Sequence, residues 1–125
     1  MHKLTLLFGI ADSVGKVVRD NDLDHVDAVV VDIGEATEVV PEFMQDGYSI
    51  VSDEYDFLKG SELIINRIKA IGICENCGEE FDIMKYKGRC PECGSFDKEV
   101  ISGFDFYIRE VRVYERSAAD GGIAE

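Results

Sequence analysis

Residues 74–94 read CENCGEEFDIMKYKGRCPECG, and this segment sets the organisation of the whole chain. It contains two copies of one pattern, in which two cysteines separated by two residues are followed by glycine. This spacing lets both thiolates of a pair point at one ion, and the glycine permits the positive φ that the turn needs. Cys74, Cys77, Cys90 and Cys93 therefore predict one four-sulfur metal site, which leaves no coordination position for a substrate.

Zinc is the metal that we expect in this site, where its binding supplies the folding free energy of a small module. Two disulfides are the main alternative without a metal, and the repeated spacing argues against them. Iron is a further alternative, because rubredoxins hold one redox-active iron in similar cysteine turns. The spacing alone leaves zinc and iron open, and colour separates them, since ferric iron in four thiolates is red.

Two amphipathic segments and a β-branched run precede the cysteines. Residues 4–20 predict a helix, because apolar side chains recur there at spacings of three and four. These side chains are Leu4, Leu7, Ile10, Ala11, Val14, Val17 and Val18. Residues 26–33 predict a strand, and Pro41 is suited to the first turn of a second helix. The apolar face of this second helix is expected to contain Met44, Tyr48, Val51 and Tyr55.

Strands are also predicted on both sides of the cysteine segment. Residues 62–71 follow the turn at Lys59-Gly60, and Phe104, Phe106 and Ile108 alternate with polar neighbours. Val111 and Val113 continue this last strand. The cysteine segment therefore interrupts a sheet. The expected fold is α+β, with two helices packed on a three-stranded mixed sheet and an inserted zinc-ribbon-like module of four cysteines.

The chain is expected to divide into two folded parts and a tail. Residues 1–71 together with 101–116 are expected to form one α/β domain, and residues 72–100 the zinc-binding module. Residues 117–125 contain mostly small and polar side chains, which predicts a disordered tail.

The composition limits the function. The chain has 125 residues, 46% of them hydrophobic, which is enough for one globular core. It carries 26 Asp and Glu against 13 Lys and Arg, so the formal net charge of −13 argues against nucleic acid as a partner. Apolar runs are too short for a membrane span, and the first ten residues are a poor signal peptide. We therefore expect a cytoplasmic protein that has no membrane partner.

Catalysis is not expected. The chain has two histidines, His2 and His25, and no phosphate-binding glycine loop, so no serine–histidine–aspartate set can be assembled convincingly. His25 lies in a charged stretch and is interpreted as a surface residue.

The amino terminus offers a second set of metal ligands. The Met1 amine, the His2 ring and the amide nitrogens of residues 2 and 3 can surround one ion in a plane, a geometry that suits Ni(II) and Cu(II). Bacterial removal of Met1 requires a small second residue, so the amine of Met1 is expected to remain in place. A lone histidine at position two is more often an ordinary surface residue, and these residues alone leave both interpretations open.

Four groups of residues together resemble the HypA-type hydrogenase and urease nickel-incorporation proteins, and the resemblance covers nearly the whole chain. The groups are Met1-His2 before a helix, Val31-Asp32-Ile33-Gly34-Glu35 followed by Val39-Val40-Pro41-Glu42, the two cysteine turns, and Ile101-Ser102-Gly103 before the last strand. The resemblance implies nickel bound by Met1, His2 and the backbone amide of Lys3, with structural zinc in the four cysteines. It also implies delivery of nickel to a hydrogenase large-subunit precursor, or to urease accessory proteins, with the help of a GTPase. A homodimer is compatible with this function.

Lys3 departs from the family pattern, which usually opens Met-His-Glu. Its main-chain nitrogen is retained, but its ammonium group repels a nearby cation and is expected to weaken nickel binding. The rival hypothesis from another class is a zinc-ribbon interaction or nucleic-acid module in which His2 has no role.

Overall fold

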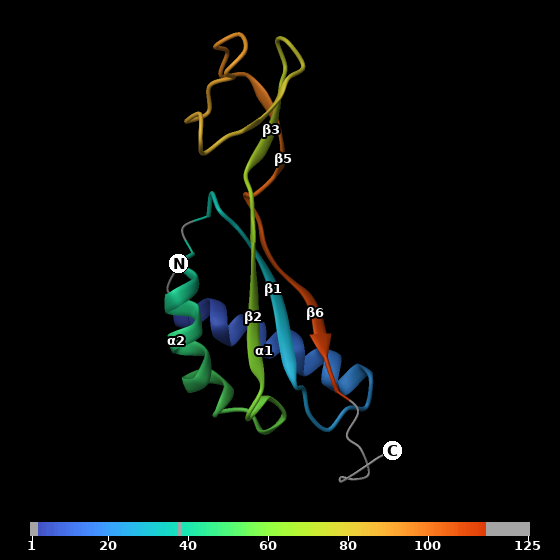
Figure 1. Ribbon diagram of the computed structural model, residues 1–125. Coiled ribbons are helices and arrows are strands. Elements are labelled where there is room, and N and C mark those ends of the chain that lie inside the picture. Colours follow the sequence, from blue (N-terminus) through green and yellow to red (C-terminus); the bar gives the residue numbers. More distant parts are fainter. Residues whose placement is uncertain (1–2, 38, 115–125) are drawn as a thin grey trace.

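The computed structural model describes residues 3–37 and 39–114. Figure 1 shows a larger part, in which helices and a sheet pack together, and a smaller part that extends beyond one end of this sheet. The elements, in chain order, are α1 (Lys3–Asp20), β1 (Ala28–Gly34), α2 (Pro41–Ser52), the 3₁₀ helix η1 (Asp56–Leu58), β2 (Glu62–Ile68), β3 (Ile71–Cys74), β4 (Glu80–Asp82), β5 (Lys98–Ser102) and β6 (Phe106–Arg112).

Two three-stranded sheets are formed. In the first sheet β1 is central, parallel to β2 and antiparallel to β6. The second sheet has the order β4-β3-β5 and is antiparallel throughout. The predicted α+β fold, with two helices and a mixed three-stranded sheet, is confirmed. The domain boundaries proposed from the sequence stay a prediction, and the tail at 117–125 lies outside the described residues.

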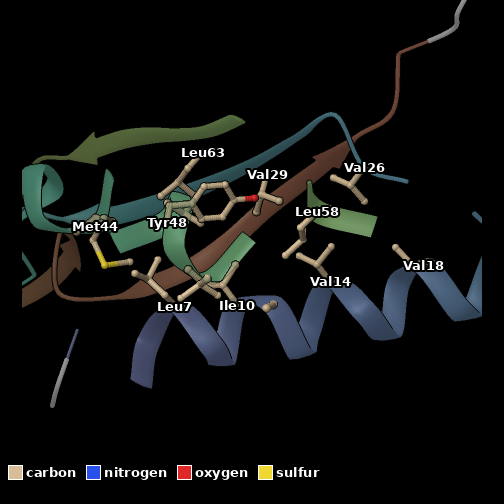
Figure 2. Packing of buried hydrophobic residues seen from close by; sticks show 14 residues of the cluster. Leu7, Ile10, Val14, Val18, Val26, Val29, Met44, Tyr48, Leu58 and Leu63 are labelled. Carbon is tan, nitrogen blue, oxygen red and sulfur yellow. The ribbon is translucent and has the colours of Figure 1, made fainter. Parts of the chain in front are cut away.

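The main core lies between the helices and one face of the first sheet. All seven residues of β1 are buried, and its odd-numbered side chains Val29, Val31 and Ile33 belong to the same core as the apolar side chains of the helices. Figure 2 shows side chains of both helices packed against those of the sheet, together with Val26, which precedes β1, and Leu58 of η1. The labelled residues are Leu7, Ile10, Val14, Val18, Val26, Val29, Met44, Tyr48, Leu58 and Leu63. Gly47 allows the helices to approach closely, since a Cβ there would lie 2.7 Å from Leu7 Cδ1.

Two expected core positions are wrong. Val17 is expected in the apolar stripe of α1, but its side chain is 37% exposed because it lies at the edge of the buried face. Tyr55 is expected on α2, but that helix ends at Ser52. Tyr55 instead packs against Phe8 and Phe57, whose ring centres are 6.4 and 5.5 Å away.

A β-bulge changes the face on which the residues of β6 lie. Val30 pairs with Glu110 and Val31 with Ile108, so Arg109 is an extra residue without a pairing partner. The bulge shifts the alternation by one residue, and Val111 consequently packs on the same core as Ile108. Period-two alternation in the sequence could not show this shift.

The strand predicted at residues 62–71 is divided between the two sheets. β2 ends at Ile68, and β3 begins at Ile71 as the central strand of the second sheet. The break falls where Ala70 is fully buried against Gly103, at the connection between the two parts of the molecule. The short strands β4 and β5 were not predicted, because cysteines, glycines and charged residues interrupt the apolar pattern there.

Asp32 is a buried carboxylate that connects all three strands of the first sheet. It is 0% exposed. Both its oxygens accept hydrogen bonds from Arg109 Nε at 2.9 Å, and Arg109 Nη2 lies 2.6 Å from Oδ2. Asn66 Nδ2 on β2 donates to Oδ1 at 3.1 Å. The bulged Arg109 thus supplies the charge that allows a carboxylate to be buried in β1.

We expect Asp32→Asn to lower the free energy of unfolding by about 2 kcal/mol, because the substitution removes charge-assisted hydrogen bonds of this size. Urea unfolding of the zinc-loaded protein at neutral pH measures the change. Asp20→Asn is the matched control. Asp20 pairs with Lys16 at the exposed surface, so its loss should cost less than about 0.5 kcal/mol. Equal losses for the two variants would contradict a stabilising role for the buried carboxylate.

Wild type and Asp32→Asn also test how acid changes the contribution of Asp32 to stability. The hydrogen bonds from Arg109 outweigh the effect of burial and, with help from Asn66, lower the pKa of Asp32 from 3.8 to about 2. A carboxylate whose pKa is lowered by folding stabilises the native state above about pH 4, and this contribution is lost as the pH falls toward about 2. The stability gap between wild type and Asp32→Asn should therefore narrow over this range. If the difference in the free energy of unfolding grew in acid, folding would not lower the pKa of Asp32.

Candidate metal centre

The two cysteine turns have the same backbone hydrogen bonds. The Gly78 N–H donates to the carbonyl of Cys74, and the Gly94 N–H donates to the carbonyl of Cys90, each at 2.9 Å. Both glycines have positive φ, of 82° and 81°. Since the two turns repeat one geometry, each presents a pair of sulfurs in the same way, as the sequence pattern predicts.

The four sulfurs meet at one point of the structure. All four Sγ atoms lie within 4.8 Å of one another. The Cys74–Cys93 and Cys77–Cys90 sulfur distances are 3.5 and 3.6 Å. In a tetrahedral site with zinc–sulfur bonds of about 2.3 Å, the sulfurs are about 3.8 Å apart. The donor set and its dimensions therefore fit a structural zinc ion.

Asn76 supports two of these sulfurs, and sequence reasoning missed it. Its backbone N–H donates to Cys74 Sγ and its side-chain Nδ2 donates to Cys93 Sγ, both at 3.4 Å. The Asn76 hydrogen bond and the backbone N–H of Ser95 together lower the pKa of Cys93 to about 6. Donors aimed at sulfur favour the thiolate form that binds metal. The only signal in the sequence is an amide side chain between two cysteines.

The apolar core around this site is small. It consists of Ala70, Phe81 and Ile83 with the two buried cysteines, Cys74 and Cys90. The other two cysteines, Cys77 and Cys93, are exposed. Because two of these five members are predicted zinc ligands, we expect this core to depend on a bound ion for its stability.

The connection between the two parts of the molecule is closely packed. The Glu35 carboxylate accepts a hydrogen bond from the Ala70 N–H at 2.7 Å. The Ala36 N–H donates to the Gly103 carbonyl at 2.9 Å. Ser102 Oγ donates to the carbonyl of Lys69 at 2.8 Å. Residues that follow β1 therefore hold both chain segments that lead into the zinc-binding module, a contact that the sequence did not predict.

Of the predicted nickel ligands, only Lys3 lies within the described residues. Met1 and His2 are outside the described residues, and Lys3 is the first residue of α1. His25 Nε2 lies 3.2 Å from Asp27 Oδ2, and His25 is far along the chain from the cysteine module. Within residues 3–37 and 39–114, no helix has the length and apolarity that crossing a membrane requires.

Comparison with known protein families gives one match that spans residues 1–113. The matching family is described as "Hydrogenase/urease nickel incorporation, metallochaperone, hypA". A hydrogenase maturation factor HypA from Geotalea uraniireducens is 34% identical over 114 residues, which cover 90% of this chain and 99% of the relative. The HypA of Acidithiobacillus ferrooxidans is 31% identical over 113 residues, with the same coverage.

Solved structures show the same fold. The solution structure of the Ni metallochaperone HypA from Helicobacter pylori matches with a TM-score of 0.65 at 20% identity, and covers 89% of this chain and 96% of that protein. A second solution structure of a HypA protein matches with a TM-score of 0.69, also at 20% identity.

Proposed function

Because this chain belongs to the HypA family of hydrogenase and urease nickel-incorporation metallochaperones, we propose that it binds Ni(II) through its first three residues. The ligands are the Met1 amine, the His2 imidazole and the main-chain nitrogens of His2 and Lys3, a planar nitrogen set that suits Ni(II). Nickel is the cargo. Zinc stays with Cys74, Cys77, Cys90 and Cys93 as part of the fold.

The position of α1 supports this proposal. The first four N–H groups of an α-helix have no carbonyl partner within the helix. Since α1 begins at Lys3, the Lys3 amide can bind a metal without breaking a helical hydrogen bond. The ammonium group of Lys3 lowers nickel affinity relative to a carboxylate but removes no ligand.

The four-cysteine site also points to separate nickel ligands. Four thiolates complete the tetrahedral coordination of zinc and leave no position for an exchanging ion. A metal that must be passed on therefore needs other ligands in this chain. The family match over residues 1–113 favours this function over a nucleic-acid module or an iron electron carrier.

We expect His2→Ala to weaken nickel binding by more than about 100-fold, because loss of a group that merely orients a ligand already costs about 10- to 100-fold. Untagged, zinc-loaded protein is titrated with Ni(II), and the d–d absorption band is followed. His25→Ala is the matched control, since it removes the other histidine and should bind nickel as the wild type does. Unchanged binding by His2→Ala would contradict the site.

Acetylation of the Met1 amine provides a second, independent test. It removes one nitrogen ligand and leaves every side chain in place, so it should abolish the planar nickel complex. Nickel uptake that survives acetylation would leave this protein with a zinc site and no nickel site at its amino terminus.

The partners follow from the same proposal. We place the protein in the cytoplasm, where it passes nickel to a hydrogenase large-subunit precursor with the help of a GTPase accessory protein. The names of the curated relatives, hydrogenase maturation factors, support a hydrogenase recipient over urease accessory proteins. Co-purification of the untagged protein with each class of recipient distinguishes the two.

A further inference from the structure

Four cations on the zinc-binding module have no carboxylate partner among the described residues. They are Lys85, Lys87, Arg89 and Lys98, here called the basic cluster. The Lys and Arg side chains that form ion pairs among the described residues are others, namely Lys16, Lys59, Lys69, Arg109 and Arg112. Lys85, Lys87 and Arg89 lie within five residues of the chain, and a Cβ at Gly88 would be 3.7 Å from Lys98 Nζ. In a chain with twice as many acidic as basic residues, this grouping of cations without a carboxylate is unexpected.

Phe96 contacts two members of the basic cluster, Arg89 and Lys98. The guanidinium carbon of Arg89 lies 4.7 Å from the centre of the Phe96 ring. Lys98 Nζ donates to the Phe96 carbonyl at 2.7 Å. The Phe96 side chain is 55% exposed. A guanidinium group held over an aromatic ring restricts its own motion and keeps N–H groups available for an anion.

The turn that carries Lys85, Lys87 and Arg89 is held in place by its own hydrogen bonds, and Lys98 is the first residue of β5. The Gly88 N–H donates to the Ile83 carbonyl at 2.8 Å, and the Arg89 N–H donates to the Tyr86 carbonyl at 3.0 Å. The Lys85 N–H donates to Asp82 Oδ1 at 3.0 Å. Because this backbone is already ordered, a ligand that binds the cations loses little additional chain entropy.

We propose that Phe96 and the basic cluster form a docking surface for an acidic segment of a partner protein, in which carboxylates flank an apolar side chain. A carboxylate matches the N–H edge of Arg89 in a bidentate geometry, and a second one can pair with the Lys98 ammonium. The apolar side chain covers the exposed ring of Phe96. This surface belongs to the zinc-bound protein and requires no nickel.

Acidic residues next to the cluster favour a short peptide over a nucleic acid. Asp97 and Glu99 flank Lys98 in the sequence, and Glu92 lies three residues after Arg89. A polyphosphate chain has closely spaced charges, several of which would lie against these carboxylates. A segment with two separated carboxylates can bind the cations without approaching all of these acids.

The test uses full-length, zinc-loaded, nickel-free protein and a fluorescent synthetic peptide in which glutamates flank a leucine. We expect the peptide to bind, and Arg89→Gln and Lys98→Gln each to weaken binding by at least about fivefold, the effect of losing one charge-assisted hydrogen bond. Lys59→Gln is the matched control, since it removes an exposed cation that pairs with Asp56 in the first part of the molecule. Measured zinc content shows that each variant retains its module.

Three results would overturn the proposal. The first is no peptide binding, or equal affinity for wild type, Arg89→Gln and Lys98→Gln. The second is tighter binding of a single-stranded DNA oligonucleotide of the same length. The third is self-association of the protein that displaces the peptide, which would assign the surface to a second copy of this chain. None of these outcomes alters the nickel titration, so this proposal and the nickel site can fail separately.

Discussion

Cys90→Ser is expected to unfold the zinc-binding module while the helices and β1 remain folded. Cys90 is 1% exposed and is both a proposed zinc ligand and a member of the five-residue core beneath the site. Structural zinc contributes about 10–16 kcal/mol of apparent binding free energy in modules of this kind, which a core of three other apolar side chains and one cysteine cannot replace. Zinc content per chain and amide hydrogen exchange by NMR measure the effect.

The pattern of exchange is specific. Amides of β3 and β5 should lose protection, whereas those of α1 and β1 should keep most of theirs, because the main core is separate from the module. Glu92→Gln is the control. Glu92 lies between Cys90 and Cys93 but is not a predicted ligand, so this variant should retain zinc. Protection of β3 and β5 in a zinc-free protein would show that the module folds on apolar contacts alone.

Gly103→Ala is expected to lower the free energy of unfolding by more than about 3 kcal/mol, or to prevent folding, through backbone strain and overpacking together. Gly103 has φ of 96°, a conformation that a side chain disfavours. A Cβ there would lie 2.2 Å from Ala70 Cα and 2.5 Å from Ala70 N. These are backbone atoms of the fully buried Ala70, so they cannot move aside as a flexible side chain can.

Two other glycines separate the causes of this effect. Gly60 has φ of 77°, and a Cβ added there would meet no atom within 4 Å, so Gly60→Ala should cost only the conformational strain of about 1–2 kcal/mol. Gly9 lies in α1 with open space around it, and Gly9→Ala should stabilise the protein by about 0.5–1 kcal/mol. Urea unfolding ranks the three variants. If Gly103→Ala lowers the free energy of unfolding no more than Gly60→Ala does, the close approach between Gly103 and the Ala70 backbone is contradicted.

The features that sequence patterns predicted are those that depend on short-range spacing. The cysteine turns could be predicted from one repeated pattern, in which two cysteines separated by two residues are followed by glycine. The structure brings the four sulfurs together. The helix at residues 4–20 and the strand at 26–33 were close to α1 and β1, because apolar periodicity reflects which side faces the core.

The features that were missed depend on contacts between distant parts of the chain. The extra residue at Arg109 becomes visible only when β6 is paired with β1, where its side chain meets Asp32. The bond from Ala70 to Glu35 joins residues 35 positions apart. No local pattern encodes either contact. The predicted nickel ligands Met1 and His2 lie outside the described residues, so that site stays a prediction that the titration must decide.

The insertion of the module between β2 and β6 has a consequence for the first sheet. When the module is ordered, two short segments at Lys69–Ala70 and Gly103–Asp105 lead into and out of it. When it unfolds, residues 69–105 become one long loop, whose closure has an entropic cost that β6 must overcome in order to pair with β1. Zinc bound by the four cysteines, none of which lies in the first sheet, is therefore expected to stabilise the pairing of the edge strand β6 with β1. Loss of zinc should make β6 the first strand of this sheet to separate.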